Sequence, residues 1–168
     1  MDMDPDSLAL SLVGPGLVAG GDGDRYNYDG STGIYIGWGM ESMTLNVGEG
    51  VTVQGGRGWN TSDDPEAWSG GYGRPGIYQD GCTGFFTLEN AGTIVGGDGG
   101  DCLGAGEYER NGGIGACGLE VYGSSSSGTV VATINNLATG VIRSGNGGDG
   151  CGLGGDVDSA IEVGYVGQ

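Results

Sequence analysis

The 168-residue sequence contains no histidine and no lysine. Histidine is the commonest general base of enzymes and the commonest side-chain ligand of transition metals, so its absence removes the usual catalytic triads and most zinc sites. The four cysteines also make a zinc site improbable, because none of them belongs to a CxxC pair. The spacing of the cysteines is compatible both with two disulfides and with four free thiols. The four are Cys82, Cys102, Cys117 and Cys151.

Positive charge is scarce. Five arginines oppose 22 acidic residues, which gives a formal net charge of −17. A charge of this size repels the phosphates of nucleic acids and the head groups of anionic lipids, so we expect no nucleic-acid partner and no insertion into a membrane. The sequence also lacks a run of about 18 apolar residues that could span a bilayer. Its acidic start, MDMDPDS, differs from the basic start of a secretory signal peptide.

Glycine is the most abundant residue, at 43 of 168. This content is compatible with disorder, but 36% of the residues are hydrophobic, and the β-branched and aromatic ones cluster in short runs. Collagen is excluded because the glycines have no strict three-residue period. We therefore expect one folded domain with a core.

A repeat lies inside this glycine-rich background. GIYIG at 33–37 and GIYQ at 76–79 open two similar stretches, and in both a Thr-Leu pair begins 11 residues after the first glycine, at Thr44 and Thr87. Further copies open with GLEV and AIEV, so the period is 42 to 43 residues. A period of this length indicates stacked units of structure. The starts fall near residues 33, 76, 118 and 160.

The repeat predicts an all-β fold, a short parallel β-solenoid (β-helix). Each copy holds three short β-prone runs, and such a coil buries its apolar side chains only by stacking on its neighbours about 4.8 Å away. We assign 1–32 to an N-terminal strand and glycine-rich lead-in, and 33–168 to the repeat domain. Stacking would produce two buried ladders, one of Ile34, Ile77, Leu119 and Ile161, and one of Leu45, Leu88 and Ile134.

A glycine-rich excursion follows the strands of each copy. All excursions leave from the same corner of a coil, so they should lie side by side. We expect them to pack backbone to backbone in an extended, polyproline-II-like form, because aromatic residues punctuate them. The alternative is a set of floppy surface loops. The excursions cover 55–75, 96–117 and 144–158.

The stretch TLENAGTIVGGDGG at 87–100 resembles a repeat of bacteriophage tail-fibre and tail-tip proteins and of autotransporter-type adhesins. That repeat joins an asparagine, Gly-Thr-Ile and a glycine-rich segment in a β-solenoid. TINNLATGVIRSGNGG at 133–148 is similar, whereas Val47 occupies the second asparagine's place in the first copy. The resemblance extends over about 33–158. It implies a noncatalytic, outward-facing surface protein, often a trimer.

On this resemblance we expect a structural or adhesive protein of a bacteriophage virion, either a tail-fibre or tail-tip component or a capsid decoration protein. The expected partners are two further copies in a homotrimer, other virion proteins, and a host-surface glycan or protein. The expected location is the virion surface. Two alternatives stay open: a fragment of a bacterial surface adhesin, and a polysaccharide-cleaving β-helix enzyme with two acids in a groove.

A calcium site is the one cofactor hypothesis that the sequence offers. GGDGGDCLG at 96–104 fits the calcium-binding nonapeptide GGxGxDxUx, with Asp98 and Asp101 as the carboxylates. Such sites need tandem copies, because successive turns share each ion. In the related stretches Arg25 and Gly152 stand at the aspartate position, so chance remains the alternative explanation.

Two further groups are candidates for function. The aromatic residues Trp38, Trp59, Trp68 and Tyr72 could form a flat binding surface, or could pack inside an oligomer. Cys102 and Cys151 occupy matching places in consecutive excursions, which makes them candidates for a disulfide. Two buried free thiols are the alternative.

Overall fold

The computed structural model describes residues 7–37, 40–61, 67–103, 110–123 and 130–165. This part of the chain is all-β and contains no helix, so no described helix could cross a membrane. Its twelve strands form three four-stranded sheets. Every pair of neighbouring strands is parallel.

The first sheet shows why these residues form strands. In β4 the side chains alternate between buried and half-exposed, and Met43, Leu45 and Val47 are the buried ones. This two-residue period is that of a strand with one face on a core. The same alternation recurs in β7, whose buried residues include Phe86 and Leu88. The sheet contains, in order, β1 (Ser7–Leu12), β4 (Ser42–Val47), β7 (Phe85–Asn90) and β10 (Val131–Asn136).

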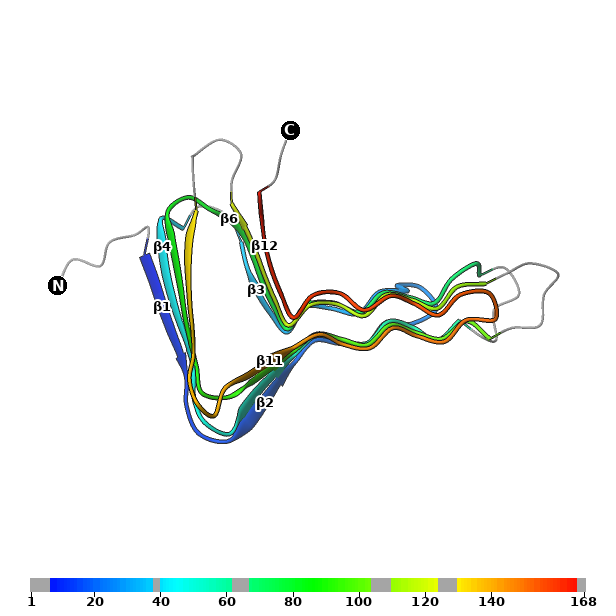
Figure 1. Ribbon diagram of the computed structural model, residues 1–168, viewed down its shortest axis with the longest axis horizontal. Coiled ribbons are helices and arrows are strands. Elements are labelled where there is room, and N and C mark those ends of the chain that lie inside the picture. Colours follow the sequence, from blue (N-terminus) through cyan, green and yellow to red (C-terminus); the bar gives the residue numbers. More distant parts are fainter. Residues whose placement is uncertain (1–6, 38–39, 62–66, 104–109, 124–129, 166–168) are drawn as a thin grey trace.

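In the other two sheets, too, every third strand of the chain is a neighbour. One contains β2 (Gly16–Ala19), β5 (Val51–Gln54), β8 (Thr93–Val95) and β11 (Val141–Arg143). The other contains β3 (Ile34–Ile36), β6 (Ile77–Cys82), β9 (Leu119–Gly123) and β12 (Ile161–Tyr165). Three consecutive strands therefore make one layer, from layer one (β1–β3) to layer four (β10–β12). Figure 1 shows the three sheets around a triangular core, with the layers lying one behind another.

The register of both predicted ladders is confirmed, and their burial is complete only in the middle layers. Ile34 pairs with Ile77, Ile77 with Leu119, and Leu119 with Ile161. Leu45, Leu88 and Ile134 are aligned in the first sheet, where Leu10 extends their row. Side chains of the middle layers are fully buried, and each such Leu or Ile contributes about 1.5–3 kcal/mol by leaving water. At the end of the stack Ile161 is 38% exposed.

The N-terminal segment belongs to the same stack. Strands β1 and β2 pair in register with β4 and β5, so layer one completes the sheets that the repeats form. The predicted N-terminal strand is confirmed as β1. The stack therefore continues across the boundary that the sequence suggested between residues 32 and 33.

Candidate functional site

The glycine-rich excursions leave the core together and form a long arm (Figure 1). Each has an outgoing leg (20–24, 55–61, 96–103 and 144–150) and a return leg (27–33, 70–76, 110–118 and 153–160). Backbone hydrogen bonds join equivalent legs of neighbouring layers at every third residue. The Gly55 amide donates to the Val95 carbonyl at 3.0 Å, and the Gly58 amide donates to the Asp98 carbonyl at 2.8 Å. A three-residue period is that of the polyproline-II helix.

Glycine is required because the legs touch through their backbones. A Cβ atom on Gly97 would overlap the carbonyl oxygen of Gly56, and one on Gly71 would overlap that of Tyr28. The Gly71 amide also donates to the Trp59 carbonyl of the outgoing leg at 3.0 Å, so the two rows of legs are bonded to each other. The prediction of side-by-side, backbone-packed excursions is therefore confirmed.

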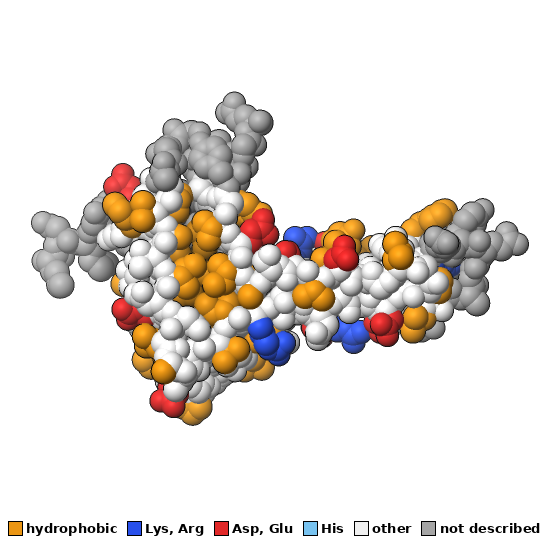
Figure 2. Space-filling model, in the orientation of Figure 1, with side chains coloured by type: hydrophobic (Ala, Val, Ile, Leu, Met, Phe, Trp, Pro, Cys, Tyr) orange, Lys and Arg blue, Asp and Glu red, His pale blue; other side chains and the backbone are white. Residues whose placement is uncertain are grey.

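This packing leaves side chains mainly on the outside of the arm. On the outgoing legs polar side chains recur at every third position, as at Arg57 and Asn60, and Figure 2 shows charged and hydrophobic side chains on the surface of the arm. The outgoing legs carry charged and amide groups: Asp22, Arg57, Asn60, Asp98, Asp101, Asn146 and Asp149. The return legs, together with Ser69 just before one of them, line a shallow groove of ≈ 320 Å³ with a mixed set of side chains: Ser69, Tyr72, Asn111, Ile114, Leu153 and Asp156.

The groove is the candidate binding surface. Tyr72, Ile114 and Leu153 are 46%, 40% and 68% exposed. They come from three different layers, so only the stacked arm brings them together. Of the aromatic candidates, Tyr72 lies in this groove, and Trp68, which is 67% exposed, precedes the groove residue Ser69.

The remaining aromatic candidates are Trp59 and Trp38. The Trp59 ring is half-buried and stacks on Tyr28, with 5.3 Å between ring centroids and an interplanar angle of 17°. It therefore joins layer two to layer one within a single chain. Trp38 lies outside the described residues.

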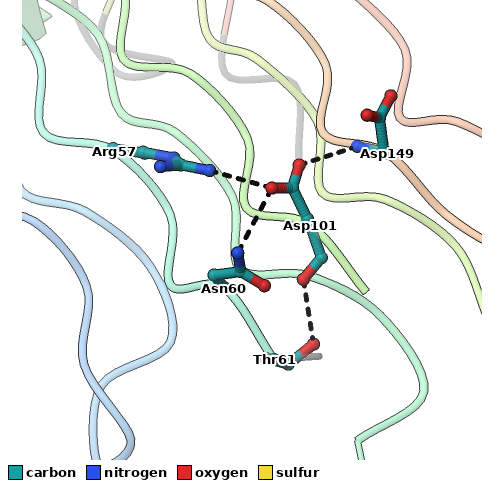
Figure 3. Close-up of polar contacts among 5 residues, drawn as sticks. All are labelled: Arg57, Asn60, Thr61, Asp101 and Asp149. Atoms are coloured by element: carbon teal, nitrogen blue, oxygen red, sulfur yellow. Dashed lines mark hydrogen bonds and ion pairs between the residues drawn. The ribbon is translucent and has the colours of Figure 1, made fainter. Parts of the chain in front are cut away.

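The two aspartates of the calcium hypothesis tie layers together, and Figure 3 shows the contacts of Asp101. Asp101 Oδ2 accepts hydrogen bonds from Arg57 Nη2 and Asn60 Nδ2, both at 3.2 Å, and its Oδ1 accepts the Asp149 amide at 2.9 Å. Asp98 Oδ1 accepts the amide of Asn146 at 2.7 Å and its Nδ2 at 3.1 Å. These contacts give both carboxylates a structural role, and the cation that pairs with Asp101 is Arg57.

The disulfide proposed for Cys102 and Cys151 is not formed, and both residues are free thiols. The two excursions do lie side by side, but Cys102 forms its parallel bridge with Gly150. Cys151 is thus one residue out of register. Cys102 is buried and Cys151 is exposed, so the two residues differ in environment as well as in register.

A second polar cluster, which the sequence analysis missed, lies where the return legs meet β9 and β12. The ligand atoms of Cys117, Asp158 and Glu162 are within 4.8 Å of one another, the separation that a bound metal ion would need. The Cys117 thiol donates to Glu120 Oε2 at 3.7 Å, and the Tyr122 hydroxyl donates to Glu162 Oε1 at 2.9 Å. The signal in the sequence was the glutamate shared by GLEV and AIEV.

Register explains the electrostatics of this cluster. Glu120 and Glu162 occupy paired positions of β9 and β12, so two carboxyl groups lie on adjacent strands. Burial raises the pKa of Glu120, and the neighbouring Glu162 adds to the effect. Burial also raises the pKa of the Cys117 thiol far above its ordinary value, again with a contribution from Glu120.

Comparison with known proteins assigns no family to this arrangement. The chain matches no protein-family model, no curated protein and no solved structure.

Proposed function

We propose that the chain is a noncatalytic structural and adhesive protein of a bacteriophage virion, built as a short parallel β-solenoid. It would be a tail-fibre or tail-tip component, or a capsid decoration protein, located on the virion surface. In this role the stack of layers is the anchor and the arm is the part that reaches a host-surface glycan or protein.

The groove on the return legs is the observation that carries this proposal. A tyrosine, an isoleucine and a leucine alternate there with the polar groups of Ser69, Asn111 and Asp156. Apolar surface beside a few hydrogen-bonding groups is the chemistry of a recognition site, and an aromatic ring can cover the apolar face of a sugar ring. The backbone-packed interior of the arm supports recognition because it holds the groove in one shape.

Binding to isolated host-envelope polysaccharide and to envelope protein tests the proposal. Tyr72→Ala and Leu153→Ala should each weaken binding to one of these by about tenfold, equivalent to about 1.4 kcal/mol. Phe85→Ala is the matched control, since Phe85 is 61% exposed on the first sheet, away from the arm. Equal binding by all variants, or no binding to envelope material, would contradict the adhesive role.

One observation favours a second candidate, a polysaccharide-cleaving enzyme. Glu120 and Asp158 line a smaller cavity of ≈ 180 Å³ beside the groove, together with Arg74. Paired carboxyl groups about 5–10 Å apart cleave glycosidic bonds. A reducing-end assay after incubation with host polysaccharide separates the candidates. New reducing ends that disappear in Glu120→Gln would establish the enzyme and overturn the noncatalytic proposal.

A further inference from the structure

We infer that copies of this chain associate head to tail, with layer four of one copy against layer one of the next. The two ends of the stack are complementary in backbone hydrogen bonding, in apolar side chains and in charge. The inference concerns these ends and is independent of the groove on the arm.

The hydrogen bonds between equivalent legs have a single direction. On the outgoing legs an amide of each layer donates to a carbonyl of the next layer, from Gly20 to Gln54, from Gly55 to Val95, and from Gly96 to Arg143. The return legs repeat this direction, from Gly30 to Tyr72, from Gly73 to Ile114, and from Gly115 to Asp156. One end of the arm must therefore carry unused donors and the other unused acceptors.

The unused groups can be named from the register. In layer four the amides of Ser144, Gly147 and Gly154 occupy the donor positions, and within the described residues they have no hydrogen-bond acceptor. In layer one the carbonyls of Ala19 and Asp22 occupy the acceptor positions. A second copy placed one layer beyond the first would pair the Ser144 amide with the Ala19 carbonyl and the Gly147 amide with the Asp22 carbonyl, as each internal layer already does.

Apolar side chains match at the same two ends. Leu17 of β2 and Val141 of β11 occupy one row of their sheet, and they are 66% and 45% exposed. The two residues between them in that row are Thr52 and Thr93. The row is thus apolar only where the stack ends, and a head-to-tail contact would lay Leu17 of one copy on Val141 of the other.

The corner after the first sheet repeats this pattern. Val13 and Leu137 follow the paired residues that end β1 and β10, and they are 86% and 51% exposed. The equivalent residues of the middle layers are Gly48 and Ala91. Exposed apolar side chains that appear at both ends, in matching positions, are typical of an interface.

Charge is complementary as well. Inside the arm Arg57 pairs with Asp101 of the next layer at 3.2 Å, three positions further along the leg than its own register partner, Asp98. Arg143 of layer four is aligned with Ala19 through the rows of the second sheet, and Asp22 stands three positions beyond Ala19. A head-to-tail contact therefore places the Arg143 guanidinium near the partner copy's Asp22 carboxylate in the geometry that Arg57 and Asp101 already show.

These features favour a second copy at the ends over the closed trimer expected from the resemblance. A closed trimer joins lateral faces and leaves both ends uncovered, whereas a head-to-tail contact uses donors and acceptors together and does not close into a ring. The net charge of −17 opposes association at low salt. Screening at 0.15 M salt, where the Debye length is about 8 Å, should therefore strengthen the contact.

Disulfide cross-linking of two variants, each with one introduced cysteine, tests the inference. Ser11 and Asn135 are exposed in one row of the first sheet, at opposite ends of the stack. Within one copy they are three layers apart, about 14 Å, which is too far for a disulfide. Across a head-to-tail contact they would be neighbours at about 4.8 Å. Ser11→Cys and Asn135→Cys are made in a Cys151→Ser background, because Cys151 is the exposed native thiol among those described.

The inference requires covalent dimers when the two variants are mixed and oxidised at 0.15 M salt, at least tenfold above the level in either variant alone. Dimers formed equally by one variant alone would show a two-fold contact and overturn the inference. So would a mixture that forms no dimers. The Cys151→Ser background protein gives the baseline from the remaining native cysteines.

A charge exchange provides a second test. Arg143→Asp and Asp22→Arg should each weaken self-association several-fold in sedimentation velocity, because each places like charges at the contact. Mixing the two variants should restore association, since both contacts between unlike variants then pair opposite charges. Unchanged self-association of both single variants would place the interface elsewhere.

Discussion

Asn90 Nδ2 donates a hydrogen bond to Asn136 Oδ1 at 2.8 Å, and the two side chains occupy the same corner of adjacent layers. Asn90 also accepts the Gly92 amide at 3.1 Å, and Asn136 donates to the Gly140 carbonyl at 2.9 Å. These bonds satisfy backbone groups that turn between the first and second sheets. The repeated asparagine of the sequence is therefore a corner residue. In layer two Val47 takes the same row of the sheet and packs in the core.

Asn90→Ala should destabilise the protein by about 2–4 kcal/mol, because it leaves the buried Gly92 amide and the Asn136 side chain without their partner. Urea unfolding followed by circular dichroism measures the change. Asn135→Ala is the control, since Asn135 is exposed on β10 beside Asn136, and its loss should cost at most about 0.5 kcal/mol. Equal losses for the two variants would mean that the corner bonds do not contribute to stability.

Ile77→Asp should unfold the stack. Ile77 is 0% exposed in the middle of its ladder, so the variant buries a charge with no partner, at a cost of several kcal/mol. Ile161→Asp changes the same row at its open end, where the side chain is 38% exposed, and should cost much less. Thermal unfolding of the two variants at low concentration compares them. A similar melting temperature for both would contradict the buried ladder.

Gly97→Ala should disrupt the arm while the three sheets persist. The new methyl group would overlap the Gly56 carbonyl, and backbone atoms on both legs would have to separate, at a cost above about 3 kcal/mol. Hydrogen exchange should show lost protection at the amides of Gly100, Gly113 and Gly148, which bond between legs. Gly21→Ala is the matched control, because a Cβ there meets nothing within 4 Å. Retained protection in Gly97→Ala would show that the legs are not packed.

Stability should depend on the protonation of Glu120. Burial raises the pKa of Glu120 above its ordinary value of 4.5 in the folded protein, so folding is favoured when this carboxyl keeps its proton. The contribution is present below pH 4.5 and is lost as the pH rises through the folded-state pKa. Glu120→Gln should therefore become progressively more stable than the unaltered protein between pH 4.5 and 7, measured by urea unfolding. Glu89→Gln, at an exposed position, is the control for the loss of one carboxylate charge.

Alkylation should discriminate between the described cysteines. Iodoacetamide reacts with the thiolate, and burial raises the pKa of the Cys117 thiol far above its ordinary value. Cys102 is buried and Cys151 is exposed. Peptide mapping of the native protein should find Cys151 modified and Cys102 and Cys117 unmodified. Protection of Cys151 together with Cys102, reversed by a reductant, would instead reveal the disulfide that the sequence suggested.

The sequence determined the parts of this protein that depend on period. Strands that repeat every 42 to 43 residues must pair with themselves one copy later, so the starts at Ile34, Ile77, Leu119 and Ile161 were predictable. The glycine content likewise made the backbone packing of the excursions predictable. Where neighbouring backbones touch, any Cβ collides, and a chain with this much glycine can pack in that form.

Tertiary structure decided which side chains meet. Cys102 pairs with Gly150 instead of Cys151 because the lengths of the legs set the register, and a shift of one residue changes which residues are neighbours. The grouping of Cys117 with Asp158 and Glu162 depends on the same register, across more than 40 residues of sequence. Period specifies which strands are neighbours, whereas contacts of a few ångströms between side chains depend on how each corner and leg is packed.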